Sequence, residues 1–281
     1  MPEYIRALIV ILVVGTATFY IFRPGFTAGT MTSAAFDLRR IAWYLITLAA
    51  FLSLNYWVFL LILILIINKI KKSETNKIAL FFFLMLTLPQ IKAEVPGFAG
   101  IRYLLEVDYL RTVTLLLLLP ICYQGFKNRG SEKSNFKLPD ALIFGYYFLE
   151  FSLHFQPDDI VGGIRKLINT SIDIIIPYYA ISRGVKTMKE LKEIMASFAL
   201  AGLMVAAIAI FEFSKRWLLY GSLAQALNLG WSPGYLVRGD YIRAVATSGH
   251  SLVLGYVLVA AIGAYIYIKR EFPSKFRYWL G

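Results

Sequence analysis

Long apolar runs alternate with short polar connections along the whole chain. Several runs lack charged residues over roughly 17 to 25 positions, the length that a helix needs to cross about 30 Å of hydrocarbon. We therefore predict an all-α integral membrane protein that forms one multi-pass domain over residues 1–281, with its longest connection at 214–251. About eight spans are predicted, at 4–22, 41–68, 78–91, 109–123, 138–155, 167–182, 194–213 and 252–268.

Two of these spans are short or interrupted. Span 78–91 reaches Pro89 after a few turns, and span 109–123 contains Arg111 and Pro120. Either could be a re-entrant segment, because a proline inside a helix removes a hydrogen bond and ends or bends it. Removing both crossings would leave the later connections on the same side of the membrane as before.

The composition agrees with this class, since 58% of the residues are hydrophobic and 16% are charged. Lysine and arginine gather on every second connection, which by the positive-inside rule places these connections and both termini in the cytoplasm. The basic residues do not form one stripe interleaved with aromatics, so the net charge of +12 does not indicate nucleic acid. The basic connections contain Lys69, Lys71, Lys72 and Lys77; Lys127, Arg129, Lys133 and Lys137; Arg183, Lys186, Lys189 and Lys192; and Lys269, Arg270, Lys275 and Arg277.

A polar stretch before the last span carries the candidate site. It contains Arg238, Asp240, Arg243 and His250 at the mouth of that span. Charges at the edge of hydrocarbon are costly unless they are paired or solvated, so a cluster there is a candidate for function. A guanidinium suits a phosphate or diphosphate, and an imidazole suits proton transfer near neutral pH.

The spacing within that stretch leaves two interpretations open. If a helix begins near residue 242, Arg243 and His250 lie seven positions apart and face the same way, so they could contact one ligand. In the alternative, Arg238 and Arg243 contact anionic headgroups while His250 caps or packs against a helix. In the same long connection, residues 218–229 are expected to form a half-buried interfacial helix.

Other ionisable residues are weighed in the same way. Asp173 lies one turn before Pro177, which predicts a kinked helix with a polar concavity and a role for Asp173 as the partner of an arginine or in a polar pathway. Glu150 and His154 are four residues apart and are interpreted as a structural pair. Glu212 is expected to form a local ion pair with the basic residues at 215 and 216.

Cofactor and metal chemistry have little support in the sequence. The lone Cys122 excludes an intrachain disulfide, and the two histidines belong to different spans. No glycine-rich phosphate loop and no metal-ligand spacing are present, so we predict neither a cofactor nor a metal.

Three segments resemble a known family. RAVATSGHSLVLGYV, IDIIIPYYAISR and FEFSKRWLLY are similar to segments of the O-antigen ligase and O-antigen polymerase group of bacterial membrane glycan transferases, and the resemblance covers approximately residues 95–270. It implies a GT-C-like helical bundle in the bacterial inner membrane and metal-independent transfer of a glycan from a polyprenyl diphosphate carrier to lipid A core or a growing polysaccharide at the periplasmic face. Arg243 and His250 are then the predicted catalytic residues, with Arg238, Asp173 and Asp240 predicted to bind substrate.

The resemblance leaves alternatives. Members of the family usually continue through further spans, whereas this sequence ends at Gly281, so a truncated member that binds the carrier without transferring the glycan is one expectation. A membrane transporter of a polar or anionic solute would use Asp173 in its pathway. A non-catalytic partner of other envelope polysaccharide assembly proteins would need neither Asp173 nor Arg243.

Overall fold

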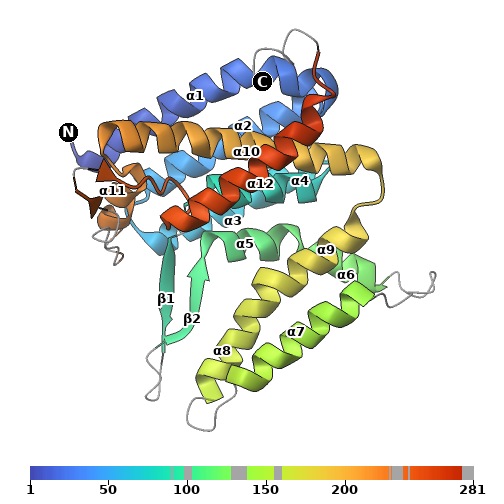
Figure 1. Cartoon of the computed structure of the whole chain (residues 1–281). Helices are drawn as coiled ribbons and strands as arrows, with labels where there is room; N and C mark the ends of the chain where they lie inside the picture. The colour runs from blue at the N-terminus through green and yellow to red at the C-terminus, as the bar shows by residue number, and fades with distance from the viewer. Residues whose placement is uncertain are drawn as a thin grey trace.

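The computed structural model describes residues 1–89, 91–97, 103–127, 138–154, 160–227, 229, 237–239 and 241–273. These residues form mostly helices and two small antiparallel hairpins, so the all-α prediction holds except at the hairpins (Figure 1). The helices are α1 (Glu3–Gly29), α2 (Ser33–Leu52), α3 (Tyr56–Ser73), α4 (Lys77–Thr87), α5 (Tyr109–Leu117), α6 (Leu119–Lys127), α7 (Leu138–His154), α8 (Ile160–Thr170), the π-helix η3 (Ser171–Ile175), α9 (Ile176–Gly184), α10 (Met188–Lys215), α11 (Leu219–Ala226) and α12 (Ser251–Lys269). The strands are β1 (Lys92–Pro96), β2 (Tyr103–Asp108), β3 (Val237–Arg238) and β4 (Tyr241–Ile242).

Helix α10 forms the centre of the bundle and packs against α1, α4 and α12. A capping box starts it: the Thr187 hydroxyl accepts from the Glu190 backbone amide, and the Glu190 carboxylate accepts from the Thr187 amide. Small residues let α12 approach closely, because a Cβ at Gly202 would overlap the Cβ of Ala261. Such contacts let helices pack where hydrocarbon surrounds them.

Among the described helices, α1, α10 and α12 are long and apolar enough to cross a membrane. They support an integral membrane protein. The other helices are shorter or carry more charge: α4 has 11 residues, and α5 and α6 have 9 each. Eight spans and a GT-C-like bundle therefore stay predictions.

The predicted span 41–68 is wrong, because two helices occupy it. Helix α2 ends at Leu52 and α3 begins at Tyr56, and the two lie side by side (Figure 1). Between them Leu54 has a left-handed φ of +50°. The Asn55 side chain then accepts hydrogen bonds from the amides of Trp57 and Val58 and starts α3. A left-handed residue followed by an N-cap reverses the chain within a few residues.

The start of α1 and the end of α12 lie at opposite ends of the bundle (Figure 1). At the start of α1, Glu3 Oε1 accepts from Trp217 Nε1 at 2.9 Å, just beyond the end of α10. At the other end of α1, Phe26 packs against Phe272, which follows α12. The location of both termini in the cytoplasm stays a prediction.

One end of the bundle gathers most of the predicted basic connections; we call it the basic end. There Lys192 of α10 lies 2.8 Å from Glu271 after α12. The side-chain amide of Asn76, between α3 and α4, donates to the Glu190 carbonyl of α10 at 3.3 Å. The basic end includes Lys69, Lys71, Lys72, Lys77, Lys127, Arg183, Lys186, Lys189, Lys192, Lys269 and Arg270. The end where α10 finishes and α12 begins is called the loop end.

Helices α7, α8 and α9 form an arm beside the main bundle (Figure 1). Within this arm Asp140 joins α7 to α9, because its two carboxylate oxygens accept from the Tyr178 hydroxyl and from Arg183, each at 2.7 Å. Between α8 and α9, the Ile176 amide donates to the Ser171 carbonyl five residues earlier, which defines the π-helix η3. The predicted interruption before Pro177 thus takes the form of a π-helix.

The connection between α10 and α12 is only partly described. Helix α11 lies within the predicted interfacial helix 218–229, but it packs against α1, and Leu219 and Leu223 are buried. Tyr220 is buried as well. A helix thus forms within 218–229, but most of its residues are buried against the bundle, and its location at a membrane interface stays a prediction.

Candidate functional site

The buried side chain of Glu212, near the end of α10, holds the loop before α12 through hydrogen bonds. Glu212 Oε2 accepts hydrogen bonds from the amides of Val245 at 3.0 Å and Ala246 at 2.8 Å. Its Oε1 accepts from the amide of Leu219 at the start of α11, at 3.0 Å. One carboxylate therefore joins two separate parts of the connection between α10 and α12.

The predicted ion pair of Glu212 is wrong. Among the described residues, neither Lys215 nor Arg216 pairs with its carboxylate, and the side chain is only 1% exposed. Arg216 instead has a left-handed φ of +52°, which ends α10 and directs its side chain toward the ring of Tyr241. An acidic residue near the end of a long apolar helix was the available signal, but its amide partners could not be identified from spacing.

Further contacts fix the same loop. The Thr247 hydroxyl donates to the Leu86 carbonyl of α4, and the Ser248 amide donates to the Val245 carbonyl at 3.0 Å. Ala246 adopts a left-handed φ of +48°. A non-glycine residue in that region persists where its surroundings hold it, so residues 245–248 form a rigid support.

Arg243 lies two residues before this support, directly after strand β4. Its side chain is partly exposed, and within the described part of the chain it has no ion pair. Arg216, which ends α10, lies 5.4 Å above the ring of Tyr241 in β4, and this ring stacks on Phe213. Arg238 is in strand β3 and pairs in register with Tyr241, but its side chain lies outside the described part. Asp240 is also outside the described residues.

His250 is the N-cap of α12. Its Nδ1 accepts the amide hydrogen of Leu252 at 3.2 Å, and its side chain is exposed. The predicted helix from residue 242 is absent, because 241–242 is a strand and α12 begins at Ser251. Arg243 and His250 therefore do not share a helical face. A neutral imidazole has one donor and one acceptor nitrogen, so capping through Nδ1 places the proton on Nε2.

Asp173 lies in the π-helix and is the partner of an arginine, as one of the two interpretations expected. Arg111 of α5 binds it through two hydrogen bonds, from Nε to Oδ1 at 3.0 Å and from Nη2 to Oδ2 at 2.8 Å. Arg111 Nη1 also donates to the carbonyl of Glu106 in β2 at 2.9 Å. Asp173 has no described contact with Arg243 or His250, so the predicted site divides into two places.

Asp108 completes the polar group around Arg111. It caps α5 by accepting from the Arg111 amide at 2.6 Å, and its carboxylate lies 3.5 Å from Arg111 Nε. Burial raises the pKa of the Asp108 carboxyl above its ordinary value, while its hydrogen bond to the Arg111 amide and the nearby guanidinium lower it. The charges of Arg111, Asp108 and Asp173 thus largely satisfy one another.

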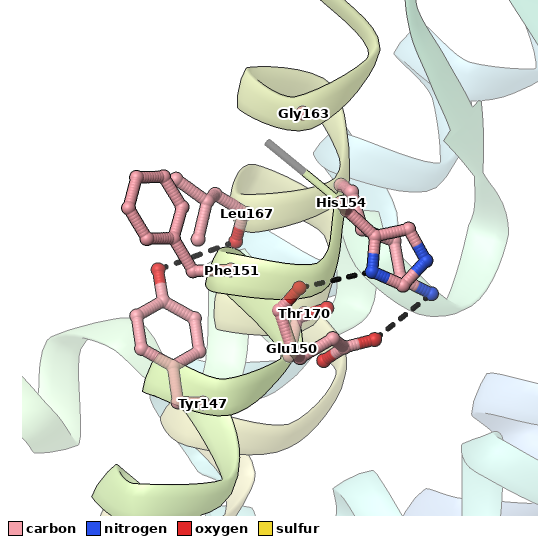
Figure 2. A pocket seen from close by; sticks show the side chains of 8 residues that line it. Tyr147, Glu150, Phe151, His154, Gly163, Leu167 and Thr170 are labelled. Carbon is pink, nitrogen blue, oxygen red and sulfur yellow. Dashed lines mark hydrogen bonds and ion pairs between the residues drawn. The ribbon is translucent and has the colours of Figure 1, made fainter. Parts of the chain in front are cut away.

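The predicted pairing of the Glu150 and His154 side chains is replaced by contacts with other groups. Both residues line a pocket between α7 and α8 (Figure 2), where Glu150 Oε1 lies 3.0 Å from Lys166 Nζ of α8. His154 Nδ1 lies 2.9 Å from the backbone carbonyl of Glu150, so the imidazole does not contact the carboxylate. Tyr147 adds a hydrogen bond of 2.8 Å to Ser171. These contacts connect α7 to α8 and the π-helix.

Metal-binding clusters of histidine, cysteine, aspartate and glutamate are not found among the described residues. Cys122 is buried, and its thiol donates to the Ile176 carbonyl at 3.4 Å.

Comparison of the chain with protein families, with curated proteins and with solved structures finds no match. The resemblance to the O-antigen ligase group therefore rests on the three quoted segments alone.

Proposed function

We propose that the loop end binds the diphosphate of a polyprenyl-linked glycan and that the protein transfers this glycan to lipid A core or to a growing polysaccharide. The observation that supports the binding step is the placement of Arg243. It follows β4 just before the rigid support, is partly exposed and has no ion pair in the described part of the chain, while Arg216 contacts Tyr241 of the same strand. A guanidinium held in this way can donate two parallel hydrogen bonds to a phosphate.

The same placement suits the chemistry of transfer. Departure of a diphosphate leaves negative charge, and positively charged donors fixed in advance stabilise it without a metal ion. The attacking hydroxyl must also lose a proton to a base. His250 is a poor base in this geometry, because its Nδ1 accepts the Leu252 amide and its Nε2 carries the proton. In the proposal the departing diphosphate takes up the proton of the attacking hydroxyl, and His250 donates a hydrogen bond through Nε2 to a phosphate oxygen.

The proposal includes an orientation in the bacterial inner membrane. The positive-inside rule places the basic end in the cytoplasm, so the loop end and the start of α1 face the periplasm. This revises the predicted location of the N-terminus and keeps the end of α12 in the cytoplasm.

Cysteine labelling tests this orientation. In a Cys122→Ser background, we expect Pro2→Cys to react with a membrane-impermeant maleimide in intact spheroplasts, whereas Ser73→Cys at the end of α3 reacts only after permeabilisation. Both positions are exposed, so solvent access within the protein is matched. Equal labelling of the two before permeabilisation would exclude the orientation.

Binding of a polyprenyl diphosphate-linked glycan to the protein in nanodiscs tests the function. We expect Arg243→Ala to raise the dissociation constant roughly tenfold or more, because a charge-assisted hydrogen bond contributes about 1.5 to 3 kcal/mol. Asp173→Asn serves as the control, since Asp173 belongs to the separate Arg111 group.

The outcomes distinguish the competing functions. Equal binding by wild type and Arg243→Ala would contradict the carrier site and favour an assembly partner. Loss of solute uptake in Asp173→Asn proteoliposomes, with carrier binding unaffected by Arg243→Ala, would favour a transporter. The two hydrogen bonds from Arg111 to Asp173 count against that function, because they neutralise the acid that a transport pathway would need.

A further inference from the structure

A pocket at the basic end is separate from the loop before α12. It has a volume of about 200 Å³ and is formed where the start of α4, helix α6, the end of α9 and the start of α10 meet. Figure 1 shows α6 and α9 side by side, with the chain rising from α9 into α10. Gly184 permits this approach, because a Cβ there would lie 2.7 Å from Ile78 Cδ1 and 3.2 Å from Ile121 Cγ2.

Two of the polar side chains that line the pocket already form hydrogen bonds within the protein. Asn76 is occupied: its amide nitrogen donates to the Glu190 carbonyl at 3.3 Å, and its oxygen accepts from the Ala79 amide at 3.0 Å. The Glu190 carboxylate accepts from the amides of Lys186 at 2.8 Å and Thr187 at 3.3 Å. These two side chains therefore form the wall and are not available to a ligand.

Lys77 is the lining residue whose charge is not engaged. Its side chain is half-buried, and in the described part of the chain it forms neither an ion pair nor a side-chain hydrogen bond. Thr75 lines the same pocket with an exposed hydroxyl-bearing side chain, and the exposed Lys186 and Lys189 lie next in sequence to the lining residues Val185 and Glu190. Four cations lie near the pocket, these three lysines and the buried Arg39, against the three carboxylates of Glu190, Glu74 and Glu193, so the charge around the pocket is positive.

The remaining wall is apolar and comes from Ile78, Ile121 and Val185. A ligand that fits must therefore join an anionic group to an apolar body at the surface of a membrane protein. Phospholipid headgroups have this character, and basic pockets between membrane helices on the cytoplasmic side bind them. We propose that this pocket binds the phosphate of an anionic phospholipid, with Lys77 and Thr75 contacting the phosphate oxygens and the two isoleucines contacting the glycerol and first methylene groups.

This site does not depend on the proposed function at the loop end, and binding of a water-soluble short-chain phosphatidylglycerol to the detergent-purified full chain tests it by native mass spectrometry. We expect Lys77→Gln to weaken binding about fivefold, the effect of one cation at such a surface, and Lys77→Arg to retain it. Lys72→Gln is the matched control, because it removes an exposed charge from the same end outside the pocket. Phosphatidylcholine of the same chain length and inorganic phosphate are measured in parallel.

Each outcome decides the proposal. Preference for phosphatidylglycerol over phosphatidylcholine, lost in Lys77→Gln and kept in Lys72→Gln and Lys77→Arg, supports it. Equal losses in Lys77→Gln and Lys72→Gln would show attraction by the whole basic end and overturn it. Equal binding of the two lipids would overturn it too, and inorganic phosphate binding as tightly as the lipid would assign the site to free phosphate. Unchanged thermal unfolding of Lys77→Gln confirms that folding does not explain its loss.

Discussion

Replacing Glu212 by alanine is expected to lower the free energy of unfolding by about 3 to 5 kcal/mol. Three backbone amides, those of Leu219, Val245 and Ala246, would lose their acceptor at once. Each buried donor without a partner costs about 1 to 3 kcal/mol, and the cavity left by the side chain adds to this. Thermal unfolding of the detergent-purified protein measures the effect.

Two variants provide controls for Glu212→Ala. Glu212→Gln keeps one acceptor oxygen, so its loss should be intermediate. Glu3→Ala removes a single hydrogen bond, to Trp217, from the same end of the bundle and should cost about 1 kcal/mol or less. If Glu212→Ala unfolded at the same temperature as Glu3→Ala, the carboxylate would not be the support of the loop before α12.

Arg39→Met is expected to cost a similar amount, about 3 to 5 kcal/mol, because it leaves buried carboxylates without their cation. Arg39 is fully buried, with Nη2 2.8 Å from Glu193 Oε1 and 3.7 Å from Glu74 Oε1. The double variant Arg39→Met, Glu193→Met should recover part of the loss, since an apolar pair replaces an ion pair with less penalty than a broken one. Thermal unfolding of the single and double variants measures their coupling.

The decrease in the free energy of unfolding caused by Arg39→Met should also depend on pH. Burial raises the pKa of the Glu74 carboxyl, against the opposing effect of Arg39, and removing Arg39 raises it further. A group whose pKa is higher in the folded state destabilises the fold while it is charged, and the cost disappears as pH falls and the carboxyl takes up a proton. Arg39→Met should therefore be less destabilising at acidic than at neutral pH. A loss that grew as the pH fell would contradict this explanation.

The local pattern of apolar and polar residues was sufficient to predict the long apolar helices but not the breaks between them. The periodic runs that became α1, α10 and α12 were predicted with nearly their observed cores, since each has few charges over many turns. The reversal at Leu54 was missed because its signal is three residues long and lies inside an apolar run.

Prediction of the candidate site was limited because the residues that contact each other lie far apart in the sequence. Asp173 was identified from Pro177 nearby, but its partner Arg111 lies 62 residues away, and Glu212 reaches amides 33 and 34 residues away. Such pairs depend on packing between helices, which spacing in the sequence does not determine. His250 was identified as a residue of interest, and the structure gives it the capping role that was the alternative interpretation.

The π-helix also sets the direction in which the side chains of α9 point around the helix axis. A π-turn holds one more residue than an α-turn, and one residue corresponds to a rotation of about 100° around a helix axis. Asp173 in the π-helix faces Arg111, while Arg183 beyond it faces Asp140 on α7. A regular helix through this region would turn one of these pairs away from its partner. The extra residue therefore acts as an angular offset that lets a single rod meet two neighbours on different sides.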